Sequence, residues 1–381
     1  MPASLRLALF YGAYFSVVGV QLPFWPVWLA GRGLDAEAIG VILAGTLWFK
    51  IASNPLAGWA ADRTGNRKAV MLSLAVANVL ALLLLQNAAG FWPLFLLSLL
   101  ASAAFSALMP LGDNLTLSVA EEKHLDYGRI RLWGSVSFIA AALGGGTVLT
   151  RSSSETVLPL LTVAAGLTLA ACLALPTHGF ARTPLAPRAW RVLFFDRRQL
   201  LFLAAATAIQ ASHSIYYAFG TLHWRSLGYS DAAIGTLWAE AVLAEIALFA
   251  WGGRLVARLG PGRLLVLAGV AGVVRWTLTS ALTALPLLLV LQLLHALTFG
   301  AAHLAAMRFL AHAFPPELSA TGQSLYSATV AGIGFGLVMA GSGPLYGSFG
   351  GDAYLAMAGL AALGAICGWR LARSWHGERL A

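Results

Sequence analysis

Charged side chains are scarce in this chain, and their scarcity excludes a soluble protein of this length. Only 10% of the 381 residues are Asp, Glu, Lys or Arg, whereas 59% are hydrophobic and the mean hydropathy is +0.78. A soluble domain carries about 25% charged residues, because it must cover its surface against water. We therefore expect the lipid bilayer to be the solvent of this protein.

Cysteine is also nearly absent, and with it several kinds of site. The two cysteines, Cys172 and Cys367, both lie in apolar runs, so the sequence predicts neither a disulfide framework nor a metal site. The sequence contains no recognisable nucleophile–base pair, zinc-ligand spacing or phosphate-binding loop. We therefore expect no enzyme activity and no cofactor.

Apolar runs fill almost the whole chain and predict an all-α integral membrane protein. A spanning helix needs about 20 apolar residues, and the N-terminal run is too long for a signal peptide, so we interpret it as the first retained helix. Twelve transmembrane helices are expected, over residues 5–30, 38–61, 69–88, 92–117, 131–150, 155–176, 199–222, 231–252, 263–282, 285–312, 320–346 and 352–371. The polar stretch at 177–198 divides them into two pseudo-symmetric six-helix bundles. The expected domains are 1–176, a linker at 177–198, and 199–381.

The basic residues are distributed unevenly among the loops between these helices. Of 24 Lys and Arg residues, 18 lie on one side of the expected membrane, which includes the two termini and the 177–198 loop. The loops of the opposite side hold only Arg32, Arg151 and Arg225. By the positive-inside rule, both termini and the long loop are cytoplasmic, in a bacterial-type inner membrane. The net charge of +9 is therefore explained by topology and does not predict nucleic-acid binding.

An internal repeat relates the two halves. Residues 33–65 recur at 228–260 with a constant shift of 195 positions, so that "GLDAEAIG" corresponds to "GYSDAAIG". Gly58, Arg63 and Gly65 fall on glycine or arginine at the shifted positions. A duplicated half-chain of membrane helices is the construction expected of a secondary transporter whose site lies between the halves.

The loop after the second expected helix carries a family motif. The sequence Gly58-x-x-x-Asp62-Arg63-x-Gly65-x-Arg67-Lys68 resembles the signature of the major facilitator superfamily. The resemblance implies that Gly58, Asp62, Arg63, Gly65 and Arg67 form a conformational latch that pins the ends of neighbouring helices. The alternative is a loop whose charges only set the topology.

Further patches resemble the lactose-permease group, nearest to its phenylpropionate-permease branch. They are "LPFWPVWL", "YGRIRLWGSVSF", "RLGPGRLLVLAGVAGVVRW" and "LLHALTF", which occur in a consistent order over both halves. The resemblance places Asp113 and Arg131 on a carboxylate–arginine pair that binds sugar hydroxyls. It places Arg275 and His295 in a proton-coupling cluster. Thr298 stands where that group has a carboxylate, and Val242, between Glu240 and Glu245, stands where it has a site acid.

Ionisable residues inside the expected helices are the strongest functional candidates, because an unpaired charge at bilayer depth costs several kcal/mol. Lys50 could attract an anionic substrate or neutralise a carboxylate in the cavity, unless it reaches toward the interface. Its repeat mate is Glu245, which we favour as the proton-titrating group. Glu240 points about 140° away from Glu245 on a helix, so only one of the two should line the pathway. Arg275 needs a counter-charge, and a purely structural ion pair is its alternative role.

Aromatic and polar residues on the first and seventh expected helices suit a flat, apolar ligand. In this superfamily those helices line the cavity, and they carry Tyr14, His213 and Tyr217, among others. The alternative is that these residues anchor the helices at the membrane interface or pack between helices. We assign these three to substrate binding together with Lys50, Asp113 and Arg131.

The sequence thus predicts a monomeric secondary active transporter of a small organic solute, working by alternating access. Proton-coupled symport of a small, aromatic carboxylate is the favoured function. The Asp113–Arg131 match favours instead a sugar or nucleoside symporter, and export of a drug or metabolite is a third alternative, since no residue fixes the direction. The expected partners are the solute, protons and the bilayer.

Overall fold

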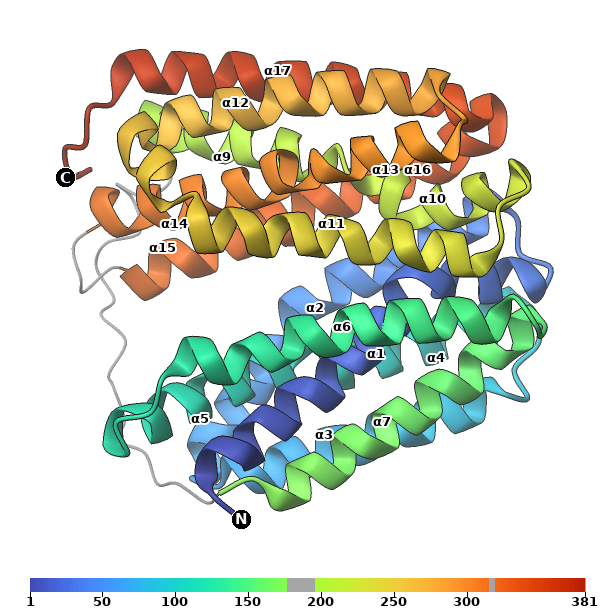
Figure 1. Ribbon diagram of the computed structural model, residues 1–381. Helices are drawn as coiled ribbons and strands as arrows, with labels where there is room; N and C mark the ends of the chain where they lie inside the picture. Colours follow the sequence, from blue (N-terminus) through green and yellow to red (C-terminus); the bar gives the residue numbers. More distant parts are fainter. Residues whose placement is uncertain (177–195, 315–318, 381) are drawn as a thin grey trace. The chain divides into compact units, whose positions relative to one another are not determined.

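A computed structural model describes residues 1–176, 196–314 and 319–380, and the regular structure in these ranges is helical (Figure 1). Residues 177–195 of the expected linker lie outside the described ranges. Within these ranges, ten stretches are long and apolar enough to cross a membrane, and one of them, Gly322–Ser374, covers the last two expected spans. The expected span 199–222 is not among the ten, because it is divided into two shorter helices.

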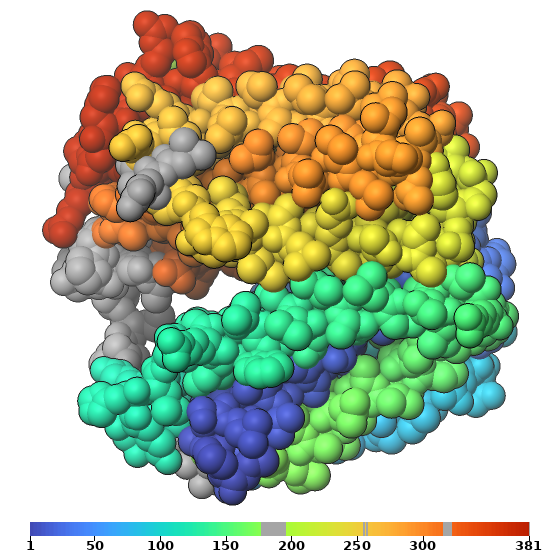
Figure 2. Space-filling model, in the orientation of Figure 1, coloured from blue at the N-terminus to red at the C-terminus, as the bar shows by residue number. Residues whose placement is uncertain are grey.

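Contacts divide the chain into two units, which we describe separately. Unit 1 comprises Met1–Thr183 with Trp224–Ala239, and unit 2 comprises Pro184–His223 with Glu240–Ala381. The helices of the first unit are α1 (Ala3–Gly31), α2 (Ala36–Thr64), α3 (Arg67–Leu85), α4 (Phe91–Ser106), α5 (Leu108–Glu122), α6 (Tyr127–Leu149) and α7 (Val157–Ala174). Helix α1 packs between α6 and α7, where its dark blue surface lies between teal and green in Figure 2.

Two helices are divided between the units, and all later helices belong to unit 2. The shared helices are α10 (Ser214–Ser226) and α11 (Asp231–Trp251). Unit 2 also contains α9 (Arg197–Ala211), α12 (Gly253–Ala281), α13 (Leu285–Leu293), η2 (Ala296–Ala301), α14 (Ala302–Ala313), α15 (Ser319–Tyr326), η4 (Ser327–Gly334), α16 (Phe335–Phe349) and α17 (Tyr354–Ser374). The segments η2 and η4 are π-helical, a local widening that is frequent at functional sites.

The outer faces of both units carry large apolar side chains. Leu84 is 58% exposed, Val163 65% and Leu363 57%, which would be costly in water. These side chains suit contact with lipid tails, because a bilayer offers no penalty for apolar exposure. The fold is therefore that of an integral membrane protein.

The internal repeat is visible in the backbone. Gly33 and Gly228, which are 195 positions apart, adopt φ angles of 81° and 86°. Gly65 and Gly260, also 195 apart, adopt φ angles of 64° and 71°. Positive φ is readily available only to glycine. Gly33 and Gly228 follow the ends of α1 and α10, Gly65 caps α2, and Gly260 marks a break in the helical backbone inside α12.

Short side chains cap the helices after these turns. The side chains of Asp35 and Asn66 accept hydrogen bonds from backbone N–H groups in the first turns of α2 and α3. Asp126 and Asp196 do the same for α6 and α9. Each cap satisfies an N–H group that would otherwise lack a partner, so the loop sequences define where these helices begin.

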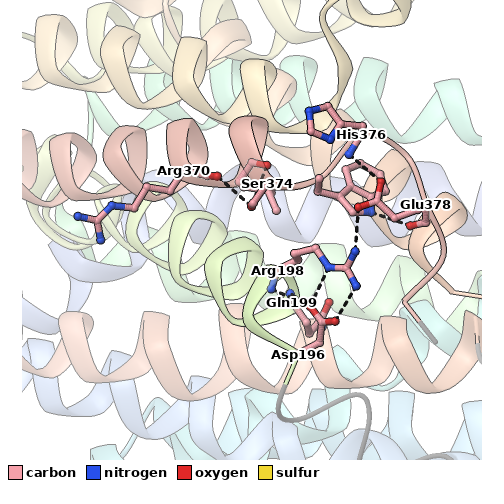
Figure 3. Close-up of polar contacts among 9 residues, drawn as sticks. Asp196, Arg198, Gln199, Arg370, Ser374, His376 and Glu378 are labelled. Carbon is pink, nitrogen blue, oxygen red and sulfur yellow. Dashed lines mark hydrogen bonds and ion pairs between the residues drawn. The ribbon is translucent and has the colours of Figure 1, made fainter.

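The residues after α17 contact the first turn of α9 (Figure 3). Arg198 donates to Asp196 Oδ2 at 2.9 Å and to Glu378 Oε1 at 2.8 Å. Trp375 is buried, with its ring centroid 4.8 Å from that of Phe309, and its Nε1 donates to the backbone oxygen of Glu378 at 2.7 Å. The Arg198 guanidinium lowers the pKa of the Asp196 carboxyl, chiefly by hydrogen bonding. The tail therefore ties α9 to α17 by both charge and packing.

Candidate functional site

A buried arginine organises the interior of unit 2. Arg275, on α12, has no exposed surface. Its Nη1 atom lies 3.0 Å from His295 Nδ1 and 3.1 Å from Thr298 Oγ1, and its Nη2 donates to Gln292 Oε1 at 2.9 Å. Among the described residues, no carboxylate lies within ion-pair distance of Arg275. The guanidinium is thus held by neutral groups.

Aromatic rings complete the shell of this arginine. The guanidinium carbon lies 4.7 Å from the ring centroid of Tyr216 and 4.6 Å from that of Trp276. Tyr216 Oη donates to Gln292 Oε1 at 3.1 Å, and Trp276 Nε1 donates to Ser212 Oγ at 3.0 Å. Cation–π contacts are stronger when the cation is desolvated, so these rings offset part of the cost of burying a charge.

Two histidines flank the arginine from different helices. His213 is fully buried, and its Nε2 lies 3.1 Å from Thr298 Oγ1. It sits at the break between α9 and α10, where the expected seventh span loses its helical continuity. His295 lies just before the π-helical segment η2. The sequence interpretation separated these residues into substrate binding and proton coupling, and the structure places both in one cluster.

Glu245 approaches the same cluster from α11. Its Oε2 lies 3.9 Å from His295 Nε2, and its side chain is 20% exposed. Gly300 borders this acid, because a Cβ atom there would lie in ordinary contact with Glu245 Cγ at 3.5 Å and closer to Leu248 Cδ2 at 3.0 Å. The structure thus places His295 between Glu245 and Arg275.

Glu240, one and a half turns earlier on α11, lies elsewhere. Its Oε2 is buried and makes no hydrogen bond within the described ranges. Glu240 and Glu245 therefore have different neighbours. Tyr217 lies with its ring centroid 5.8 Å from that of His213 and interacts electrostatically with Glu245. It therefore borders the cluster on the side of the acid.

Unit 1 contains a second polar cluster, formed by α1, α5 and α6. Asp113 Oδ1 accepts hydrogen bonds from Tyr11 Oη at 2.5 Å and from Tyr127 Oη at 3.2 Å. The guanidinium of Arg131 lies over the rings of Phe15, at 4.2 Å, and Tyr11, at 5.3 Å. Asp113 and Arg131 therefore belong to one cluster, but Tyr11 mediates between them and they form no ion pair.

Tyr14 and Lys50 occupy different surroundings in the same unit. Tyr14 is buried and stacks on Phe105, with ring centroids 4.2 Å apart and an interplanar angle of 7°. Lys50 is half-buried midway along α2, and it forms no hydrogen bond or ion pair with any residue that the structure describes.

The motif after α2 connects several helices. Arg67 donates to Asn114 Oδ1 on α5 and lies 3.9 Å from Asp62 Oδ1, while Lys68 donates to the backbone oxygen of Leu175 at 2.8 Å. Arg63 lies over the ring of Trp59, at 5.1 Å. Gly58 has open space where a Cβ would stand, and Gly65 ends α2 with its positive φ. The loop thus links the ends of α2 and α3 to α5 and α7.

Sequence reasoning missed part of both clusters. It assigned no role to Tyr127, which donates to Asp113, to Trp276, which packs on Arg275, or to Ser212, which accepts from Trp276. It gave Gln292 no role either. The three-residue spacing of Gln292, His295 and Thr298 was the available signal, since all three contact Arg275.

Comparison with known proteins gives consistent matches over the whole length. The MFS_1 like family model matches residues 4–356. The probable 3-phenylpropionic acid transporter of Escherichia coli (strain K12) is 36% identical over 363 residues, covering 92% of this chain and 93% of that protein. The maltose permease of Geobacillus stearothermophilus is 32% identical over 335 residues, covering 86% and 83%.

A solved structure shares the fold. A crystal structure of a mutant of nucleoside transporter NupG superposes with a TM-score of 0.86 at 18% identity, covering 97% of this chain and 100% of that chain. The expected fold, two related bundles of membrane helices, is confirmed by this match and by the helical architecture. At this identity the likeness concerns the fold alone.

Proposed function

This chain belongs to the MFS_1 like family, and on that premise we propose that it imports a small aromatic carboxylate together with a proton. Membership makes it a secondary transporter in the membrane and not an enzyme. The observation that carries the choice of solute is the near full-length similarity to the probable 3-phenylpropionic acid transporter.

The charges inside the two units support an anionic solute. Lys50 has no acidic partner among the described residues, and Arg275 is surrounded by neutral ligands. A hydrogen bond from a cation to a carboxylate contributes about 1.5–3 kcal/mol. In this proposal Lys50 receives the carboxylate, while Tyr14 and Tyr217 offer aromatic faces to the ring. Asp113 and Arg131 complete the binding residues.

Proton coupling is assigned to Glu245, with Arg275 and His295 as the groups around it, and Glu240 is the alternative proton carrier. Glu245 is the acid that reaches the Arg275 cluster and is also partly exposed. Its protonation would remove one negative charge when the solute brings another, so the sum of charge in the pathway would stay constant. The site could then close both with the solute and a protonated Glu245 and with neither solute nor proton.

Transport by alternating access requires the two bundles, 1–176 and 199–381, to move about a central site. We place both termini and the 177–198 linker in the cytoplasm, because the basic loops lie on that side. The contacts of Arg67 and Lys68 support a latch made by Gly58, Asp62, Arg63, Gly65 and Arg67. We propose that the transporter works as a monomer.

Uptake into proteoliposomes tests the solute and the coupling together. Radiolabelled 3-phenylpropionate should accumulate when the outside is made acidic, and excess unlabelled solute should compete. Maltose, a galactoside and uridine serve as competitors for the sugar and nucleoside alternatives, of which maltose is favoured by the permease relative. Competition by maltose, with none by 3-phenylpropionate, would assign the protein to sugar transport.

A further inference from the structure

The directions of the hydrogen bonds around Arg275 follow from the chemistry of the partners. A guanidinium donates and never accepts, and a carbonyl oxygen accepts and never donates. His295 Nδ1 faces the Nη1 group of Arg275 at 3.0 Å, so this nitrogen is the acceptor. The proton of a neutral His295 ring must then lie on Nε2, the nitrogen that faces Glu245.

His213 has the opposite arrangement. Its Nδ1 lies 3.1 Å from the backbone oxygen of Ile209 and 3.2 Å from that of Gln210, so Nδ1 carries the proton and donates. Its Nε2, 3.1 Å from Thr298 Oγ1, is then an acceptor in the neutral ring.

Thr298 joins the arginine to this second ring. Its hydroxyl oxygen accepts from Arg275 Nη1 at 3.1 Å, which leaves the hydroxyl hydrogen free to donate to His213 Nε2. The competing acceptor, the backbone oxygen of His295, lies at 3.5 Å and is the weaker one. One arginine thus donates directly to His295 and, through Thr298, indirectly to His213.

We propose that Arg275 holds His295 and His213 as neutral rings of opposite tautomer, so that a proton entering this cluster is taken by Glu245 and by neither histidine. A second proton on His295 would have to occupy Nδ1, where it would meet the Arg275 donor. A second proton on His213 would occupy Nε2 and displace the Thr298 hydrogen. Either would put a second positive charge beside a buried guanidinium, at sites that are 5% and 0% exposed.

Glu245 makes no hydrogen bond or ion pair with Arg275. The groups that face it include His295 Nε2, an N–H donor at 3.9 Å, and Tyr217. The distance exceeds that of a direct hydrogen bond, so the carboxylate can take up a proton without breaking any bond to Arg275. The role of this proton in transport rests on the proposed function, but the tautomers do not.

Thr298 is a positioning residue in this arrangement. It must accept and donate at the same time, which serine can also do and valine cannot. Thr298→Val therefore removes the link to His213 at nearly constant shape, and Thr298→Ser restores it.

Nitrogen NMR of the full-length protein in lipid bilayers tests the proposal. With ¹⁵N-labelled histidine, the imidazole nitrogens of each ring report whether they carry a proton, and His213→Gln and His295→Gln assign the two residues. We expect His213 protonated on Nδ1 and His295 on Nε2, both neutral from pH 8 down to pH 6. In Thr298→Val the His213 signals should shift or divide between tautomers, whereas Thr298→Ser should match the original protein.

A doubly protonated His295 or His213 at pH 6, or one shared tautomer, would overturn the inference. So would identical His213 signals in Thr298→Val and the original protein. If Thr298→Val does not fold, the tautomers of the unaltered protein still decide. The spectra need no solute, so a failure of 3-phenylpropionate uptake would contradict the proposed function and leave this result unaffected.

Discussion

The Nε2 atom of His295 lies 3.9 Å from Oε2 of Glu245, while the other nitrogen of the same ring contacts Arg275. A neutral ring therefore separates a buried cation from a partly exposed acid. In the proposed cycle, this separation lets Glu245 change its charge while Arg275 keeps all of its hydrogen bonds. It also makes the two residues separable by mutation.

Replacing Arg275 should destabilise unit 2 strongly. Arg275→Met leaves Gln292, His295 and Thr298 without their donor in a buried site, which we expect to lower the free energy of unfolding by about 3 kcal/mol. Arg263→Met, at an exposed position of the same helix, should change it by less than about 0.5 kcal/mol. Thermal unfolding in detergent compares the two, and equal midpoints would contradict the structural role of Arg275.

Gly65 should tolerate alanine less well than Gly58. Neither position has an atom within 4 Å of an added Cβ, but Gly65 has a φ of 64° and Gly58 lies inside α2. Gly65→Ala should therefore destabilise by about 1 kcal/mol through backbone strain, whereas Gly58→Ala should be neutral or stabilising by up to about 1 kcal/mol. The difference in unfolding midpoint isolates the backbone effect, and the reverse order would refute it.

The contact between Arg198 and Asp196 should make stability depend on pH. Hydrogen bonding by Arg198 lowers the pKa of Asp196 in the folded state, so this contribution is present above the unfolded-state pKa and is lost as pH falls through the folded-state value. Asp196→Asn keeps the helix cap but loses the charge. The variant should melt below the original protein at pH 7, and the difference should shrink toward pH 3. A difference that grew in acid would contradict the assignment.

Lys50 should govern affinity for the solute's carboxylate. Loss of one charge-assisted hydrogen bond of about 1.5–3 kcal/mol corresponds to roughly a tenfold to hundredfold increase in KM. We expect this of Lys50→Gln in 3-phenylpropionate uptake. The control is Lys123→Gln, since Lys123 is exposed at the end of α5 and belongs neither to the proposed binding residues nor to the latch. An unchanged KM in Lys50→Gln would remove Lys50 from the binding residues.

The sequence predicted the fold well because hydropathy and repeated glycines are local signals. The equivalence of Gly65 and Gly260, for example, is visible both in the repeat and in their φ angles. The break at His213 was not predicted, because no glycine or proline interrupts α9 and α10 there. At the break the His213 ring contacts Thr298 and the backbone oxygen of Ile209, and helical spacing does not reveal these contacts.

The candidate sites were predicted by residue type but not by partner. Arg275 and His295 were expected in one cluster, yet the expectation of a counter-charge for Arg275 overlooked the imidazole of His295, which lies between Arg275 and Glu245. Likewise, Tyr11 contacts both Asp113, through its hydroxyl, and Arg131, through its ring. Such contacts depend on how aromatic side chains pack between helices, which helical spacing alone does not define.

The central claim is that Glu245 carries the coupled proton. A gradient of one pH unit is worth about 1.4 kcal/mol and supports about tenfold accumulation at one proton per solute. In proteoliposomes under such a gradient, we expect the original protein and Glu240→Gln to accumulate 3-phenylpropionate. Glu245→Gln should exchange labelled for unlabelled solute and yet reach no more than the external concentration. Accumulation by Glu245→Gln equal to that of the original protein would contradict the account.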